Sequence, residues 1–267
     1  MKPRKPGLTF QDALPHWCDD AEFAQITNAG SFSLPYVETY LNRVMLRAKE
    51  TLTGERYAKL RDDIDLFVKQ ESNHYRQHRL FNNKLEQDGY TGVTPIGARL
   101  GADYDDFLKS ESLLFNTAYC EGFESLGIIQ TEFFFEQAGD LLTGADPRVV
   151  ALWKWHLAEE YEHRSVCFDV HKAVHGGFSY FSRLGGYFRA VRHLGKFGKD
   201  ASDALLAHDR ATMTPEQLQA SMASEKAYRR RFGRFALPRL LRVLSPFYNP
   251  VRKREPDGAA AFLLQYE

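Results

Sequence analysis

The chain has 267 residues, and its 35 Lys and Arg balance its 35 Asp and Glu, so the formal net charge is zero. This neutrality argues against the uniformly basic surface of a nucleic-acid coat protein, and no nucleic-acid partner is expected. A hydrophobic content of 43% with 13% aromatic residues argues against a disordered chain. The charge is nevertheless uneven, because residues 1–175 carry a net −8 and residues 176–267 a net +8. The acidic and the basic part of the chain are therefore expected to have different functions.

The three cysteines are far apart and form no Cys-x-x-Cys pair. This pattern indicates a reducing compartment, with neither a disulfide framework nor a zinc ribbon. The basic start at residues 1–5 is not followed by the apolar segment of a secretory signal. No run approaches the ~20 apolar residues of a membrane span. The expected localisation is cytoplasmic.

Apolar residues that recur every three or four positions predict long helices along most of the chain. A polar extension, residues 1–33, precedes them and contains one short helix near residues 17–26. The predicted helices of the bundle span about 35–52, starting at Pro35, then 55–87, 103–139 and 147–175. Further helical stretches are predicted at about 180–197, 200–210 and 215–244. Few β-branched alternations occur, so the sequence predicts an all-α fold, a four-helix bundle over 34–177 with a basic helical extension, 178–267, that packs on it.

Each helix of the predicted bundle carries acidic residues on an otherwise apolar face. Residues 71–74 and 160–163 both read Glu-x-x-His, a spacing that puts a carboxylate and an imidazole on one side of a helix. Unpaired carboxylates are costly to bury, whereas two divalent cations would neutralise four of them. Bundle sites for two metal ions combine two such motifs with one glutamate from each of the other helices. The predicted ligands are Glu38, Glu71, His74, Glu121, Glu160 and His163.

Other polar residues lie next to this set. His156, one turn before the second motif, is included as a seventh ligand, with a supporting role as the alternative. His78, one turn after the first motif, is expected to be a supporting or core histidine. On the third helix, Glu132 is an alternative to the single glutamate chosen above. Glu124 and Glu159 lie off the centre of their faces and are expected to be supporting or solvated residues.

Two segments resemble a known family. Residues 155–170 (WHLAEEYEHRSVCFDV) are similar to the signature of a bacterial family of predicted metal-dependent hydrolases, and residues 70–78 (QESNHYRQH) to its other signature. The stretches 35–38 and 117–121 fit the remaining two helices, whereas the basic C-terminal part matches less clearly. Ferritin-like di-iron carboxylate proteins share the six-ligand pattern, so the resemblance implies that fold. The helix with His156 is also similar to that of di-iron arylamine N-oxygenases, which use a third histidine.

The first functional prediction is a di-iron enzyme that uses O2 to oxidise a small organic substrate in an apolar pocket. Two Fe ions suit mixed imidazole and carboxylate ligands, and Mn or Zn are the alternatives. Electrons would come from an external donor, because no flavin or nicotinamide motif is present. The alternative is a hydrolase in which two metal ions activate water. The second alternative is a metal-binding bundle without catalysis.

Residues 226–254 contain ten Lys and Arg and no Asp or Glu, interleaved with aromatic and aliphatic residues. This stretch is expected to cover the acidic bundle of the same chain. Weak contact with an anionic membrane surface is the alternative, because basic amphipathic helices bind there. A homodimer is a further option that the sequence leaves open.

Overall fold

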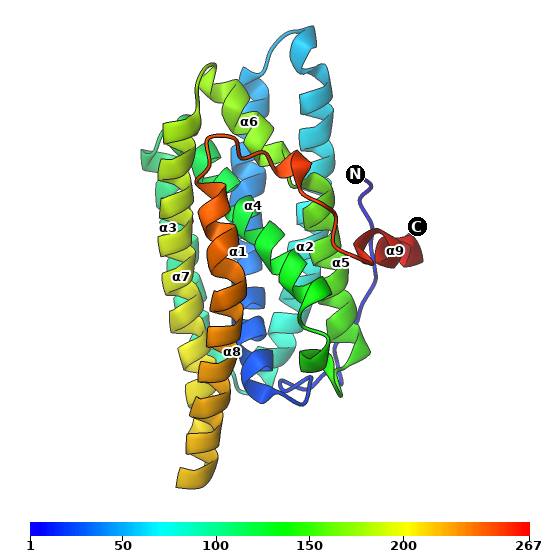
Figure 1. The fold of residues 1–267 in the computed structure, drawn as a ribbon, viewed down its shortest axis with the longest axis vertical. Coiled ribbons are helices and arrows are strands. Elements are labelled where there is room, and N and C mark those ends of the chain that lie inside the picture. Colours follow the sequence, from blue (N-terminus) through cyan, green and yellow to red (C-terminus); the bar gives the residue numbers. More distant parts are fainter.

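The computed structural model describes residues 1–267 and contains helices but no strand, which confirms the all-α prediction. Figure 1 shows the longer helices running side by side along the long axis of the molecule. No helix combines the length and the apolar character needed to cross a membrane. The helices are α1 (Ala21–Thr51), α2 (Ala58–Gln87), α3 (Thr94–Ser110), α4 (Leu113–Glu136), α5 (Pro147–His163), α6 (Val166–His175), α7 (Tyr180–Arg210), α8 (Pro215–Val243) and α9 (Ala259–Leu263).

The first helix begins earlier than the sequence indicates. Asp20 caps α1 by accepting a hydrogen bond from the backbone N–H of Phe23 (2.8 Å), so Pro35 lies inside the helix and not at its start. A proline inside a helix leaves the carbonyl four residues earlier without its partner. Here that carbonyl belongs to Ser31, and the side-chain amide of Asn82 on α2 donates to it (3.0 Å). Contact with α2 therefore compensates for the proline and lets α1 continue.

Three predicted boundaries also differ. The single helix expected over 103–139 is two helices, because α3 ends at Ser110 and Ser112 caps α4 by accepting from the N–H of Phe115 (3.1 Å). The helix expected over 147–175 is interrupted between α5 and α6 at residues 164–165. Conversely, the stretches expected at 180–197 and 200–210 form the single helix α7.

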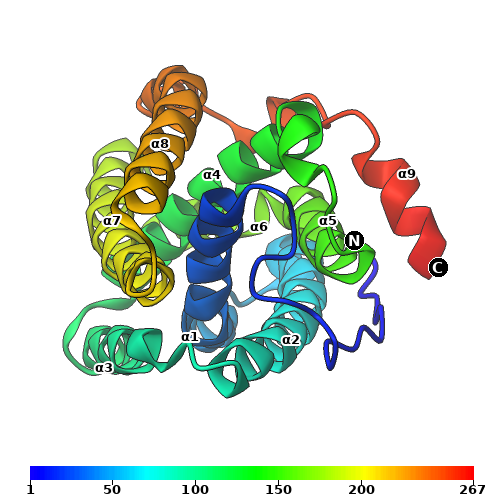
Figure 2. The same ribbon diagram turned by 90° about the horizontal axis from the view of Figure 1, so that it is seen from below.

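Seen end-on, α1, α2, α4 and α5 surround the centre of the molecule, and α7 and α8 lie outside α4 and α1 (Figure 2). Glycines permit the closest of these contacts. A Cβ atom added at Gly186 of α7 would lie 2.2 Å from the backbone of Ala118, and one at Gly122 of α4 would lie 2.8 Å from the Cα of Tyr187. The two helices therefore touch along their backbones, which decides which side of α4 remains free to face α2 and α5.

Candidate metal centre

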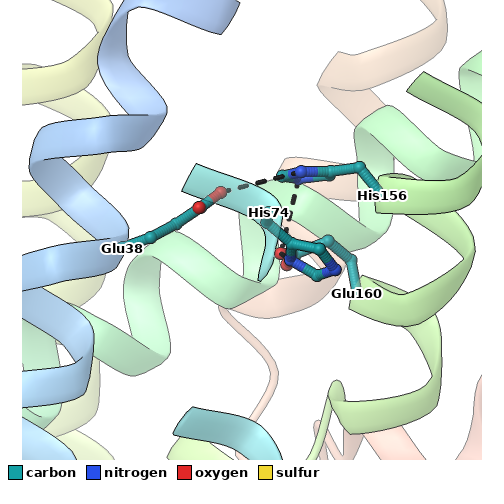
Figure 3. Close-up of side chains that lie close together, drawn as sticks. All are labelled: Glu38, His74, His156 and Glu160. Carbon is teal, nitrogen blue, oxygen red and sulfur yellow. Dashed lines mark ion pairs between the residues drawn. The ribbon is translucent and has the colours of Figure 1, made fainter. Parts of the chain in front are cut away.

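Two groups of buried acidic and imidazole side chains lie where α1, α2, α4 and α5 meet. Within each group the candidate ligand atoms all lie within 4.8 Å of one another. The first group consists of Glu38, His74, His156 and Glu160 (Figure 3). The second group consists of Glu71, Glu124, Glu160 and His163.

Glu160 belongs to both groups because its two carboxylate oxygens face in different directions. Its Oε1 lies 3.4 Å from Nε2 of His156 and 3.6 Å from Nδ1 of His74, both in the first group. Its Oε2 lies 3.4 Å from Nε2 of His163, in the second group. The first group is completed by Glu38, whose Oε1 is 3.6 Å from Nδ1 of His156 (Figure 3).

The carboxylates of the second group are arranged around Nε2 of His163. It lies 3.1 Å from Oε1 of Glu71 and 3.5 Å from Oε2 of Glu124. With Glu160, three carboxylates from α2, α4 and α5 therefore surround one imidazole nitrogen. All of these side chains are at most 2% exposed, so water does not screen their charges.

The atoms that face the two groups have no hydrogen-bond partners. Both oxygens of each of the four glutamates are unpartnered, as are Nδ1 of His74, Nδ1 of His156 and Nε2 of His163. Buried polar atoms are normally satisfied, and each exception needs an explanation. Carboxylate oxygens and imidazole nitrogens that converge in this way are a donor set that fits divalent cations as the missing partners.

Two of the imidazoles are held in the tautomer that metal binding requires. Nε2–H of His74 donates to Oε2 of Glu159 (3.0 Å), which leaves Nδ1 free toward the first group. The backbone N–H and the guanidinium of Arg4 hold Oε1 of Glu159 at 3.0 and 3.3 Å. Such carboxylate partners orient the imidazole and increase its basicity.

A side-chain amide orients His163 in the same way. Nε2 of Gln70 donates to Glu162 (2.9 Å), so the carbonyl oxygen of Gln70 faces His163. That oxygen accepts from Nδ1–H of His163 (3.2 Å) and leaves Nε2 free toward the second group. Edge-on aromatic rings, Trp155 against His74 and Phe67 against His163, complete an apolar wall around both groups.

Burial dominates the electrostatics of the site. It raises the pKa of Glu38 and of Glu124 well above the usual range, and neighbouring carboxylates add to the effect. Burial lowers the pKa of His156 to about 3. Burial also acts to lower the pKa of His74, but the hydrogen bonds to Glu159 and Glu160 outweigh it and raise that pKa to about 9. Glu38 and Glu124 therefore resist ionisation without a countercharge, and bound cations would supply one.

The structure brings six of the seven sequence-predicted ligands together, and Glu121 is the exception. Its Oε1 accepts a hydrogen bond from Ser125 (3.1 Å) and lies 3.7 Å from the guanidinium of Arg183 on α7. Glu124, one turn further along α4, lies in the second group in its place. The cause is the close contact of α4 with α7, which turns the side of α4 that carries Glu121 toward α7.

Glu124 is distinguished from Glu121 by the packing of its face of the helix. It shares one face of α4 with Gly127 and Thr131, at intervals of three and four residues. The hydroxyl of Thr131 donates to the backbone of α5, and a Cβ at Gly127 would lie 3.2 Å from Oε2 of Glu160. The small residue leaves room for the carboxylate on α5, which identifies the face of α4 that meets the site.

The remaining candidates lie outside both groups. Glu132 pairs with Arg239 (2.6 Å) and with Lys253 (3.0 Å), so it holds the C-terminal part of the chain. The ring of His78 lies 4.8 Å from that of His156, and its Nδ1 is 2.8 Å from the hydroxyl of Ser31. Glu159 supports His74, as described above.

Comparison with known proteins adds one finding. The family model described as predicted metal-dependent hydrolase matches residues 2–254. The chain belongs to this family. The match confirms the resemblance noted at residues 70–78 and 155–170 and extends it over the basic C-terminal part. No curated protein and no solved structure matched the chain.

Proposed function

We propose that the chain binds two divalent metal ions in the bundle and uses them to hydrolyse a small organic substrate. The observation that carries this proposal is the position of Glu160, whose two unpartnered oxygens face two different groups of ligand atoms. A carboxylate in that position can bridge two cations. The description of the family as metal-dependent hydrolases supports hydrolysis as the reaction.

The side chains divide between the two ions. Glu38, His74 and His156 would hold one ion, and Glu71, Glu124 and His163 would hold the other. With Glu160, four carboxylates would balance the charge of two doubly charged cations. Bound in this way, a pair of ions supplies an activated water and polarises an ester, amide or phosphate group.

The surrounding residues prepare the site for that role. Glu159 and Gln70 hold the protons of the two imidazoles on the nitrogens that face away from the ions. Arg4 and Glu162 hold those two residues in turn. Because these supports are already formed in the folded chain, binding a metal ion does not require the ligands to reorganise.

A second candidate function is oxidation of an organic substrate by O2 at two Fe ions, with electrons from an external donor. The observation that favours it is the donor set, in which three imidazoles accompany four carboxylates inside an apolar wall. Mixed nitrogen and oxygen ligands suit iron as well as zinc or manganese.

The test is to remove all metal, reload the protein with Zn²⁺, Mn²⁺ or Fe²⁺, and measure both metal content and turnover. Hydrolysis predicts two ions per chain and cleavage of chromogenic carboxylic or phosphate esters by the Zn²⁺ or Mn²⁺ form without oxygen. Oxidation predicts activity of the Fe²⁺ form alone, with uptake of O2. Metal binding without turnover in any form would favour a non-catalytic bundle, and one ion per chain would contradict both proposals.

Glu160→Gln provides the decisive variant. The amide keeps the size of the side chain but cannot bridge two cations as a carboxylate does, so both ions should be weakened together. Glu121→Gln is the control, because Glu121 is also a buried glutamate of the bundle but contacts Ser125 and Arg183 and lies outside both groups. Loss of only one ion in Glu160→Gln would show that the two groups are independent.

A further inference from the structure

The helices α7 and α8 form an antiparallel hairpin on the outside of the molecule (Figures 1 and 2). The hydroxyl of Tyr187 on α7 donates to the carbonyl of Leu240 on α8 (3.1 Å), and that of Tyr180 donates to the carbonyl of Leu244 (2.8 Å). These bonds identify the sides of the two helices that face each other.

Large apolar side chains are exposed on the outer side of this hairpin. Phe181 and Phe188, seven residues apart on α7, are 74% and 55% exposed. Leu237 and Leu241, four apart on α8, are 58% and 57% exposed. Other residues of the two helices face α4. Gly186 of α7 lies against Ala118, and Arg239 of α8 pairs with Glu132. Helical periodicity therefore puts the exposed pairs on the side away from the bundle, next to each other across the hairpin.

Two further aromatic residues extend this surface at one end of the hairpin. Phe178, just before α7, is 70% exposed, and Phe247, just after α8, is 84% exposed. Both line a cavity of about 290 Å³ whose wall also contains Lys172 and Arg252. Contiguous apolar surface of this kind is uncommon on proteins that contact only water.

The surface is also strongly basic. Residues 178–199 contain five Lys and Arg and residues 226–254 contain ten, and neither stretch has an Asp or Glu. Four of these cations, Arg231, Arg239, Lys253 and Arg254, pair with acids at 132–140 and thereby attach α8 and the chain after it to the bundle. Others are exposed and pair with no carboxylate; these include Arg189, Arg192, Arg234 and Arg242.

We propose that this outer face of α7 and α8 binds the surface of an anionic lipid bilayer. The outer face is defined by Phe178, Phe181, Phe188, Leu237, Leu241 and Phe247, with three of the unpaired arginines, Arg192, Arg234 and Arg242; the guanidinium of Arg189 instead lies over the ring of Phe115 on α4. Apolar side chains that enter the boundary of the bilayer, surrounded by arginines that meet anionic headgroups, are the two contributions that hold peripheral proteins on membranes.

The positive charge of the outer face favours an anionic bilayer over a second copy of the chain as its partner. A twofold interface brings the same surface of both copies together, so the unpaired arginines would face one another. Such an arrangement is repulsive, whereas a bilayer with acidic headgroups is complementary in charge. Membrane binding does not involve the ligand atoms of the metal centre, so this proposal can fail or succeed independently of the proposed function.

The test is sedimentation of the full chain with vesicles. Binding to vesicles that contain phosphatidylglycerol, weak binding to pure phosphatidylcholine, and release by high salt are expected. The double variant Phe181→Ser/Leu241→Ser should reduce the partition coefficient by about tenfold or more, because both side chains lose their contact with the bilayer. Arg234→Gln/Arg242→Gln should reduce binding to the acidic vesicles only.

A matched control is available on α2, which lies on another side of the molecule (Figure 2). Leu80 is exposed like Leu241, and its neighbour Arg79 is exposed as well, so Leu80→Ser and Arg79→Gln should leave vesicle binding unchanged. Equal effects of the α2 and the outer-face variants would overturn the proposal, as would absence of binding to the acidic vesicles. A dimer of the wild-type chain that Phe181→Ser/Leu241→Ser converts to a monomer, without vesicle binding, would assign the face to a second copy.

Discussion

Glu160 illustrates how one residue can connect two groups of ligands. Its carboxylate is buried among three imidazoles, and each of its oxygens faces a different set. Burial acts to raise its pKa, but the neighbouring His163 and His74 outweigh this effect and hold the pKa well below its usual range. Glu160 therefore ionises more readily than Glu38 or Glu124, whose pKa values burial raises.

The choice between Glu124 and Glu121 can be decided at the level of single residues. Both are buried glutamates on α4, one turn apart, and only Glu124 faces the ligand atoms. Glu124→Gln is expected to weaken binding of one ion by at least about tenfold, because one carboxylate of its group is lost. Glu121→Gln should leave metal content unchanged. Metal analysis after dialysis measures both, and equal loss in the two variants would contradict the geometry.

Glu121 should instead affect how stability depends on pH. Burial raises its pKa to about 7, although Arg183 and Ser125 act in the opposite direction. A carboxyl group whose pKa is raised by folding makes the fold less stable as the pH rises from the unfolded pKa, about 4.3, toward 7. Glu121→Gln removes this ionisation, so its free energy of unfolding relative to wild type should increase by ~3 kcal/mol between pH 4 and pH 8. Urea unfolding of both proteins across this pH range measures the difference. A difference in free energy of unfolding that does not change with pH would contradict the prediction.

The sequence could locate the candidate metal centre but not every residue in it. Each Glu-x-x-His motif shows which face of its helix meets the site, because a carboxylate and an imidazole three residues apart lie on the same face. On α4 no such partner exists, and Glu121, Glu124 and Glu132 all lie among apolar residues. Which of them faces the centre depends on how α4 is rotated, and that rotation is determined by its contact with α7, far away in the sequence.

At the scale of whole elements, the contact between α4 and α7 can be tested at two adjacent glycines of α7, of which only Gly186 lies against α4. A Cβ at Gly186 would lie 2.2 Å from the backbone of Ala118, whereas one at Gly185 would meet nothing within 4 Å. The same substitution at the two positions should therefore have opposite effects on stability.

Gly186→Ala is expected to destabilise the fold by about 1–3 kcal/mol or more, since α7 must move away from α4. Gly185→Ala should stabilise it by about 0.5–1 kcal/mol, because alanine is the better helix former at a site with free space. Chemical denaturation of both variants measures the difference. Similar values for the two would show that α7 does not lie against α4 in this way.

The helices themselves were predictable because their apolar periodicity is strong, but their ends were not. Pro35 is a common first residue of a helix, yet here α1 continues through it since Asn82 of α2 replaces the missing hydrogen bond. The interruption after Glu111 depends on Ser112 as a cap, and the apolar pattern runs on across it. In both cases a partner or a cap decided the boundary, and periodicity alone carries no information about either.

At the scale of the molecule, the candidate metal centre joins helices that are distant in the sequence. Its ligands come from α1, α2, α4 and α5, and the N-terminal segment joins them through Arg4, which contacts Glu159 and Glu162. Without cations, acids on separate helices are buried close together inside the bundle, which is costly to the folded state. Binding of ions should therefore stabilise the whole fold and not only the site.

Removal of the metal should accordingly lower the melting temperature. A ligand present at a hundred times its Kd stabilises the native state by about 2.7 kcal/mol, which corresponds to about 5–10 °C for a chain of this size. Calorimetry of the protein before and after treatment with a chelator measures this change, and return of the melting temperature on adding back the metal excludes irreversible damage. Glu160→Gln should melt at the same temperature with and without chelator, whereas Glu121→Gln should retain the shift. If the melting temperature of wild type does not respond to the chelator, the buried glutamates and histidines form a hydrogen-bonded network that holds the bundle together without metal.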